Sequence, residues 1–289
     1  GGGGGGGAAA NSAAADDAAA SASSAAAEPC GGVRHREFRI AMVLPWMDRD
    51  GAKAPAWFSH LVASASASAS LVDWYVPHEG SLSLPRGVRA PNVKLVELRR
   101  GGLARLFAAR LGGALGLGGG EARTLEKRLR ALFEAWPRLV AEYKPTFGEV
   151  FSAWLQNYTH WGYTDLDVIY GALPRFVQRS ELTDFDLFSY SFGDAEAVYL
   201  RGQWTVHRNG PTVNGLWRGC AHLAAGLLDE LGKKEAHLRR MEAAGSASTG
   251  HKRFISAEGC YSHVAAHTAG LRIKVAARRE RPMARPTSA

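Results

Sequence analysis

The sequence predicts an α/β domain built around a mainly parallel β-sheet. Short apolar runs, typical of buried strands, alternate along the chain with segments of helical periodicity. Strand–helix–strand order is typical of βαβ units, whose two strands run parallel. The composition agrees with this interpretation, because 46% of the 289 residues are hydrophobic and 21% are charged. Such a chain has enough apolar surface to form a buried core.

The first predicted elements lie between residues 38 and 98. Residues 38–44 form an apolar run that ends at Pro45, which favours a buried first strand followed by a loop over 45–55. Residues 56–64 then predict a helix, and residues 71–76 and 93–98 predict two further strands.

The middle of the chain predicts helices interrupted by proline. Residues 99–120 are rich in Gly, Leu and Arg, and we expect a partly mobile insertion there. Apolar residues at three- and four-residue steps from Leu125 to Val140 predict an amphipathic helix that Pro137 kinks or splits. Residues 145–155 predict another helix, with Pro145 in its first turn.

The last third of the chain mixes strands and helices. Strands are predicted at 161–171, where the strand runs into a turn, at 185–190 and at 203–208. Residues 209–231 are helical in part, and 254–266 predict a loop leading into a helix or a strand.

Both ends of the chain differ from the predicted 33–275 domain. Residues 1–32 are almost all Gly, Ala and Ser, and residues 276–289 are basic, so we expect two disordered tails.

None of the three cysteines forms a C-x-x-C pair, which argues against a zinc or redox motif. Cys220 and Cys260 are able to pair in an oxidising compartment, although their spacing does not decide this.

Two acidic residues form the most informative pattern. Asp165 and Asp167 flank Leu166 at the end of a strand-like run, and alternate residues of a strand face the same side. Paired carboxylates bind Mg²⁺ or Mn²⁺, with substrate phosphates completing the coordination shell. Two solvated acids in a turn are the alternative, because an Asp-x-Asp pattern also occurs by chance.

Three sequence blocks resemble a known family. Residues 144–151 (KPTFGEVF) fit a KPxxGxxF pattern, 161–171 (WGYTDLDVIYG) fit WGYxDxDxxxG, and 202–209 (GQWTVHRN) fit GhfxxxRN. These patterns resemble the DUF6625 group of GT-A-like, glycosyltransferase-like proteins, and the likeness spans about 38–267. The resemblance implies the GT-A fold, a Rossmann-like, mostly parallel mixed sheet flanked by helices, with the nucleotide site at the C-terminal ends of the strands.

The resemblance also implies roles for individual residues. Asp165 and Asp167 would hold the metal, and the segment 45–50 would border the nucleotide base. Lys144, Arg208 and Asn209 would contact the nucleotide diphosphate or the sugar, Glu258 would act as catalytic base or bind sugar hydroxyls, and His263 would be a third metal ligand. Surface or loop positions are the alternative for each of these residues.

The predicted function is therefore transfer of a sugar from a UDP- or GDP-sugar to an unknown glycan, lipid or protein acceptor, with Mn²⁺ or Mg²⁺ as cofactor. A non-catalytic binding protein on the same scaffold is one alternative. A basic protein that binds nucleic acid or a membrane surface is another, because the net charge is +8. The chain begins with Gly, as expected of a fragment. In that case an N-terminal anchor and a Golgi location are favoured, and otherwise a cytoplasmic one.

Overall fold

The computed structural model describes residues 37–47, 54–191, 198–245 and 256–277. The expected tail at 1–32 and most of the one at 276–289 lie outside these ranges. Within them, eight strands form one sheet in the order β2-β3-β1-β5-β7-β6-β8, with β4 paired to β3. The strands are β1 (Ile40–Val43), β2 (Trp46–Met47), β3 (Val72–Glu79), β4 (Val93–Leu98), β5 (His160–Thr164), β6 (Leu187–Ser191), β7 (Trp204–Arg208) and β8 (Ile273–Ala277).

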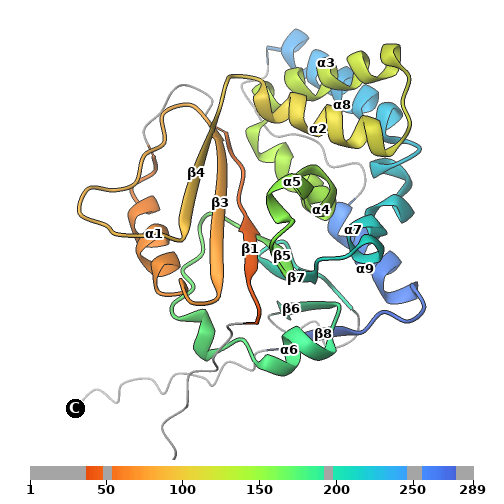
Figure 1. The fold of residues 1–289 in the computed structure, drawn as a ribbon. Coiled ribbons are helices and arrows are strands. Elements are labelled where there is room, and N and C mark those ends of the chain that lie inside the picture. Colours follow the sequence, from red (N-terminus) through yellow and green to blue (C-terminus); the bar gives the residue numbers. More distant parts are fainter. Residues whose placement is uncertain (1–36, 48–53, 192–197, 246–255, 278–289) are drawn as a thin grey trace, which may run out of the picture. The chain divides into compact units, whose positions relative to one another are not determined.

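Helices lie on both faces of the sheet. The α-helices are α1 (Phe58–Ser66), α2 (Gly102–Ala114), α3 (Gly119–Ala135), α4 (Phe147–Val150), α5 (Ser152–Leu155), α6 (Arg179–Asp184), α7 (Pro211–Gly215), α8 (Leu227–Ala243) and α9 (Ala257–His267). The 3₁₀-helices are η1 (Pro137–Thr146), η2 (Leu173–Arg175), η3 (Leu216–Gly219) and η4 (Ala221–Leu223). Figure 1 shows α1 on one side of the sheet and the group of α2 to α5 on the other.

The sheet is mostly parallel, as the sequence predicts. Strands β1, β2, β3, β4 and β5 pair in parallel, and so do β6 and β8. Only β7 runs antiparallel to its neighbours β5 and β6 among the strands described. The mixed α/β class is therefore confirmed. No helix in the described part of the chain is both long and apolar enough to span a bilayer.

Alternation along the central strand divides the core into two parts. Ile40 and Met42 of β1 face the cluster beneath α1, while Ala41 and Val43 face the larger cluster beneath α2 to α5. A strand buried on both faces explains the continuous apolar run in this part of the sequence.

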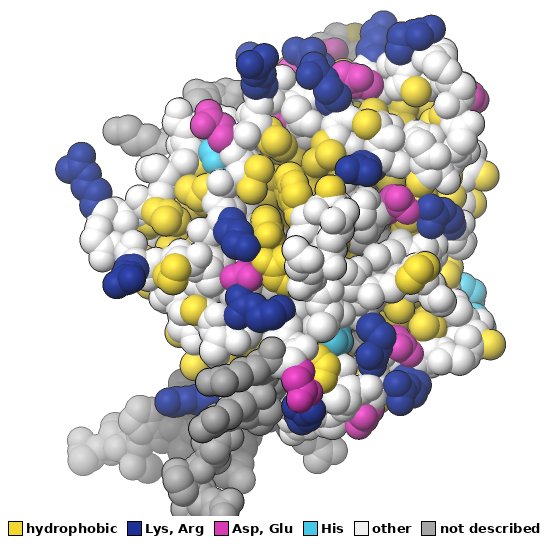
Figure 2. Space-filling model, in the orientation of Figure 1, with side chains coloured by type: hydrophobic (Ala, Val, Ile, Leu, Met, Phe, Trp, Pro, Cys, Tyr) yellow, Lys and Arg dark blue, Asp and Glu magenta, His cyan; other side chains and the backbone are white. Residues whose placement is uncertain are grey.

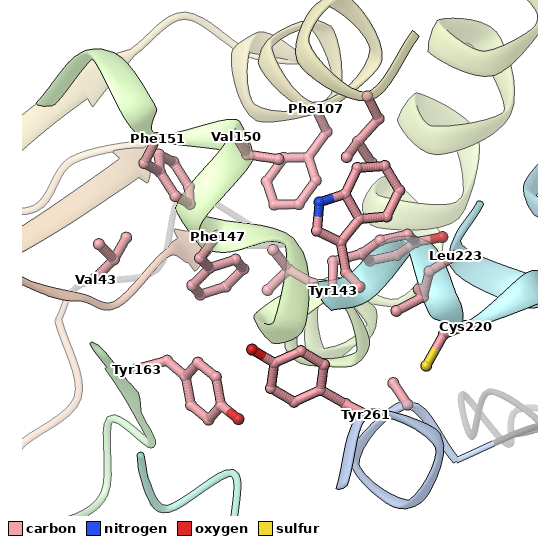
Figure 3. Close-up of a cluster of buried hydrophobic side chains, with 14 of the residues drawn as sticks. Val43, Phe107, Tyr143, Phe147, Val150, Phe151, Tyr163, Cys220, Leu223 and Tyr261 are labelled. Carbon is pink, nitrogen blue, oxygen red and sulfur yellow. The ribbon is translucent and has the colours of Figure 1, made fainter. Parts of the chain in front are cut away.

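The segment 99–120 is not a mobile insertion, because most of it is helix α2. Phe107 of α2 is fully buried and sits edge-on to aromatic rings from α3, η1 and α4, with ring centroids 5.6–6.1 Å apart. Figure 3 shows Phe107 together with Tyr143 and Phe147 in this cluster. The segment is therefore part of the core.

Prolines shape the chain after α3. That helix ends at Ala135 and Pro137 opens η1, so the predicted interruption is confirmed. Pro145 lies inside η1 rather than opening a helix, and the single helix expected over 145–155 is divided into α4 and α5. This irregular path carries the chain across the ends of β1 and β5.

Candidate active site

A cavity of about 350 Å³ opens where two parallel strands end. Strands β1 and β5 are neighbours, with Val43 opposite Tyr163, so the residues that follow them leave the sheet side by side. Ligands of α/β sheets bind at such C-terminal strand ends. The cavity is lined by Leu44, Pro45, Trp46, Met47, Trp57, Pro137, Arg138, Val140, Ala141, Lys144, Phe147, Thr164, Asp165, Leu166 and Asp167.

The Asp165–Asp167 pair lies at this cavity, but in a turn rather than in a strand. Strand β5 ends at Thr164, earlier than expected, and the hydroxyl of Tyr170 closes the turn by donating to the Asp165 carbonyl at 3.0 Å. Both carboxylates nevertheless line the cavity, and Leu166 between them packs partly into the core beside α1. The two acids therefore line the same cavity, although they do not lie at alternate positions of a strand.

Lys144 is a buried cation with two partners inside the protein. Its side chain is only 6% exposed, and its ammonium forms an ion pair with Asp165 and donates to the Gly202 carbonyl at 2.8 Å. A buried ammonium needs such partners. Lys144 therefore lies at the expected site, where it holds Asp165 in place.

Glu258 approaches the same cation from α9. Ser256 caps this helix by accepting from the Gly259 amide at 3.2 Å, which fixes the first turn that carries Glu258. A Cβ atom placed on Gly202 would lie 2.2 Å from Glu258 Oε1 and 3.4 Å from Lys144 Nζ. The carboxylate of Glu258 therefore lies near Lys144 but forms no ion pair with it, and Glu258 is not among the residues that line the cavity.

Tyr199, which the sequence did not single out, orients Glu258. Its hydroxyl donates to Glu258 Oε2 at 3.1 Å. Burial and the negative charge of Glu258 raise the pKa of Tyr199, so the phenol stays protonated and remains a donor.

Arg208 and Asn209 lie away from the cavity. Because β7 runs antiparallel to β5, Arg208 pairs with His160 at the start of β5, whereas Asp165 follows its end. At about 3.3 Å per residue, the two ends of β5 are roughly 13 Å apart. Arg208 forms an ion pair with Asp186 at 3.0 Å.

Asn209 donates instead to the carbonyls of Leu155 and Tyr158. The contacts of Arg208 and Asn209 are thus structural, and the structure does not bring either residue to the cavity. The expectation that they reach a diphosphate bound there fails because of the direction of β7.

His263 also lies apart from the two aspartates. It is exposed on α9, where its ring lies 4.1 Å from that of His267. Within the described ranges, no three His, Cys, Asp or Glu residues are grouped closely enough to hold a metal ion. Two carboxylates are still compatible with Mg²⁺ or Mn²⁺, since these ions take one or two protein carboxylates and complete their shell with phosphates and water.

The comparisons with known proteins agree in part with the motifs. One family matches residues 135–238 and is described as a family of unknown function (DUF6625). The match runs from the end of α3 to α8 and includes Lys144, Asp165 and Asp167, so it is shorter than the expected 38–267. No curated protein matches the chain.

Solved structures show only loose similarity. A transferase carrying two cysteine-to-serine substitutions matches with 11% identity and a TM-score of 0.34, over 81% of this chain and 87% of its own. Mouse xyloside xylosyltransferase 1 without ligand matches with 9% identity and a TM-score of 0.39, over 82% of this chain and 84% of its own.

Proposed function

We propose that this protein is a metal-dependent glycosyltransferase of the GT-A type, which moves a sugar from a nucleotide-sugar donor to an acceptor. The observation that carries the proposal is the placement of Asp165 and Asp167 on the wall of one cavity at the C-terminal ends of β1 and β5. A cavity of about 350 Å³ falls within the size range of small-molecule sites.

The two aspartates would hold Mn²⁺ or Mg²⁺ together with the donor phosphates. When bound, the metal neutralises the charge on the nucleoside diphosphate that leaves the sugar. Lys144 keeps the Asp165 carboxylate on the cavity wall through its ion pair. Asp167 is exposed, so its carboxylate is open to a cation entering from solvent.

Glu258 is the group proposed to act near the acceptor. Its carboxylate lies beside the Lys144 ammonium, and it accepts a hydrogen bond from Tyr199 at 3.1 Å. An ionised carboxylate in this position is able to take the proton of an acceptor hydroxyl or to bind a sugar hydroxyl.

Apolar and aromatic side chains form another part of the cavity wall. The rings of Trp46 and Trp57 meet edge-to-face with centroids 6.3 Å apart, and both residues line the cavity. Trp46 belongs to the segment 45–50 expected to border the nucleotide base. We assign these two rings to the ligand's planar or apolar part, which aromatic faces bind well.

We also propose that the protein resides in the secretory pathway. Cys220 and Cys260 form a disulfide in the structure, with Cα atoms 5.9 Å apart. Structural disulfides persist in oxidising compartments and are rare in the cytosol. The disulfide therefore favours the secretory pathway over the cytoplasm.

The charge of the α2–α3 surface favours a second candidate function, binding to an anionic surface. Figure 2 shows several Lys and Arg side chains gathered over this end of the molecule. Part of the charge is shared with acids, since Arg105 pairs with Glu126 at 3.4 Å and Arg130 with Glu134 at 3.5 Å. Such binding would weaken steeply with salt and would not depend on Asp165 or Asp167.

Calorimetric titration with UDP and GDP, with and without Mn²⁺, tests the proposal. We expect binding that requires Mn²⁺ and falls at least about tenfold in Asp167→Asn, because each charge-assisted contact is worth roughly 1.5–3 kcal/mol. Asp229→Asn is the matched control, since Asp229 is an exposed acid on α8 paired with Lys233. A folded wild-type protein that binds neither nucleotide contradicts the proposal.

A further inference from the structure

The 3₁₀-helix η1 presents a row of side chains to the cavity. It spans ten residues, from Pro137 to Thr146, whereas such helices rarely exceed three or four. With three residues per turn, positions 138, 141 and 144 lie above one another on one face. Arg138, Ala141 and Lys144 all line the cavity, which confirms that this face forms its wall.

The two cations in this row have different surroundings. Lys144 is buried and held by Asp165 and the Gly202 carbonyl. Arg138 is exposed, and its side chain forms no ion pair or hydrogen bond with any other described residue. Since each residue of a 3₁₀-helix rises about 2 Å, the two backbone positions are roughly 12 Å apart. One cation is thus fixed in the protein, while the other is available to a ligand.

Ala141 leaves space between these two positions. Its methyl group is half-buried, and it is the smallest side chain of the three in the row. Asp167, which also lines the cavity, is exposed and has no partner among the described residues. A ligand lying over Ala141 would therefore meet a guanidinium together with a carboxylate open to a metal ion. This pairing of charges suits an anion that also binds a divalent cation.

We propose that Arg138 binds the phosphate groups of the ligand over Ala141, and that Lys144 is a positioning residue for Asp165. The planar guanidinium donates two parallel hydrogen bonds to a phosphate, stays charged at every physiological pH, and needs no rearrangement of the buried pair. This inference rests on the proposed function, because it assigns the diphosphate of that donor to a residue.

Four variants test the assignment by calorimetry with UDP and with uridine, both in the presence of Mn²⁺. We expect Arg138→Ala to weaken UDP binding at least about tenfold and to leave uridine binding unchanged, since a hydrogen bond to a charged group is worth roughly 1.5–3 kcal/mol. Arg138→Lys should retain part of the affinity as a point charge, and Ala141→Leu should reduce UDP binding by filling the space above the row. Arg110→Ala is the control, because Arg110 is an exposed arginine of α2 that does not line the cavity.

The outcomes separate this inference from the proposed function. If the wild-type protein binds UDP no more tightly than Arg138→Ala does, the assignment of Arg138 is wrong, but the proposed function still stands. Equal losses for UDP and uridine also overturn it, because they would show a general effect on the cavity. A folded wild-type protein that binds no UDP overturns the proposed function and this assignment with it. Thermal unfolding of each variant checks the fold, which a change at an exposed side chain should leave intact.

Discussion

The ammonium of Lys144 and the carboxylate of Asp165 form an ion pair at the wall of the cavity, although 21 positions separate the two residues in the sequence. The lysine comes from η1 and the aspartate from the turn after β5. The same ammonium donates to the Gly202 carbonyl, so one buried cation joins three segments of the chain. This contact organises the site, because it decides where the first carboxylate of the pair lies.

The two partners should be strongly coupled in stability. Asp165→Asn leaves the buried Lys144 ammonium without its ion-pair partner, and we expect a loss of about 2–4 kcal/mol in the free energy of unfolding. Lys144→Met should cost less, because Asp165 is a third exposed and solvent can hydrate it. Chemical denaturation of both single variants and the double variant measures the coupling. Additive losses would contradict the ion pair.

Any side chain placed at position 202 should displace the side chain of Glu258. A Cβ atom there would lie 2.2 Å from Glu258 Oε1, which is the end of a flexible side chain. Gly202→Ala should therefore displace the carboxylate while lowering stability by less than about 1.5 kcal/mol. Sugar-transfer assays beside thermal unfolding test this, with Glu258→Gln as the comparison. If Gly202→Ala kept full transfer activity, Glu258 would have no role in the transfer.

Alanine substitutions at two glycines should change the free energy of unfolding in opposite directions. At Gly162 in β5, a Cβ atom would lie 2.7 Å from the backbone oxygen of Thr205, which is held in the sheet. Gly162→Ala should lower the free energy of unfolding by about 3 kcal/mol. Gly113 lies inside α2 with nothing within 4 Å of such an atom, so Gly113→Ala should raise it by about 0.5–1 kcal/mol. Urea denaturation of both variants gives the comparison, and equal shifts would contradict the packing around Gly162.

The disulfide should contribute strongly to stability. It joins Cys220 and Cys260, which are 40 positions apart, and a loop of that length corresponds to about 4 kcal/mol in the chain-entropy account. A reducing agent should therefore lower the melting temperature of the wild-type protein but not that of Cys220→Ser/Cys260→Ser. A wild-type protein insensitive to reduction would show that the bond does not form.

Buried histidines should make the fold sensitive to acid. Burial lowers the pKa of His207 from its usual 6.5 to about 3, and that of His160 to about 4. As the pH falls below 6.5, the unfolded chain takes up protons that the folded chain excludes, so stability decreases. His207→Phe keeps a ring against Trp161 and removes one of these groups. Its unfolding free energy should fall less between pH 7 and about 4.5 than that of the wild type, as urea titrations at both values would show. An unchanged slope would contradict the prediction.

Local patterns predicted much of the fold. The strand at 93–98 has the expected bounds, and Pro137 ends α3 as a residue without an amide hydrogen should. Helix α2 was missed because its glycines and arginines hid the apolar residues 103, 107 and 111, which recur every four positions. Gly112 faces α3, since a Cβ atom there would be in ordinary contact with Ala122 at 3.9 Å. Composition alone does not show such packing.

Only part of the candidate site could be predicted from the sequence. Lys144 and Asp165 form an ion pair, and the first turn of α9 brings Glu258 near them. Arg208 does not join them, since the sequence of β7 does not show that this strand runs antiparallel to β5. Arg138 was missed because its place on the cavity wall depends on the three-residue repeat of η1, whereas the sequence suggested a broken α-helix.

Crystals grown or soaked with Mn²⁺ and UDP would show where the metal ion and the nucleotide bind. We expect an anomalous manganese peak between the carboxylates of Asp165 and Asp167, with the diphosphate beside it on the wall formed by Arg138 and Ala141. Manganese or nucleotide bound elsewhere, with this cavity empty, would contradict it.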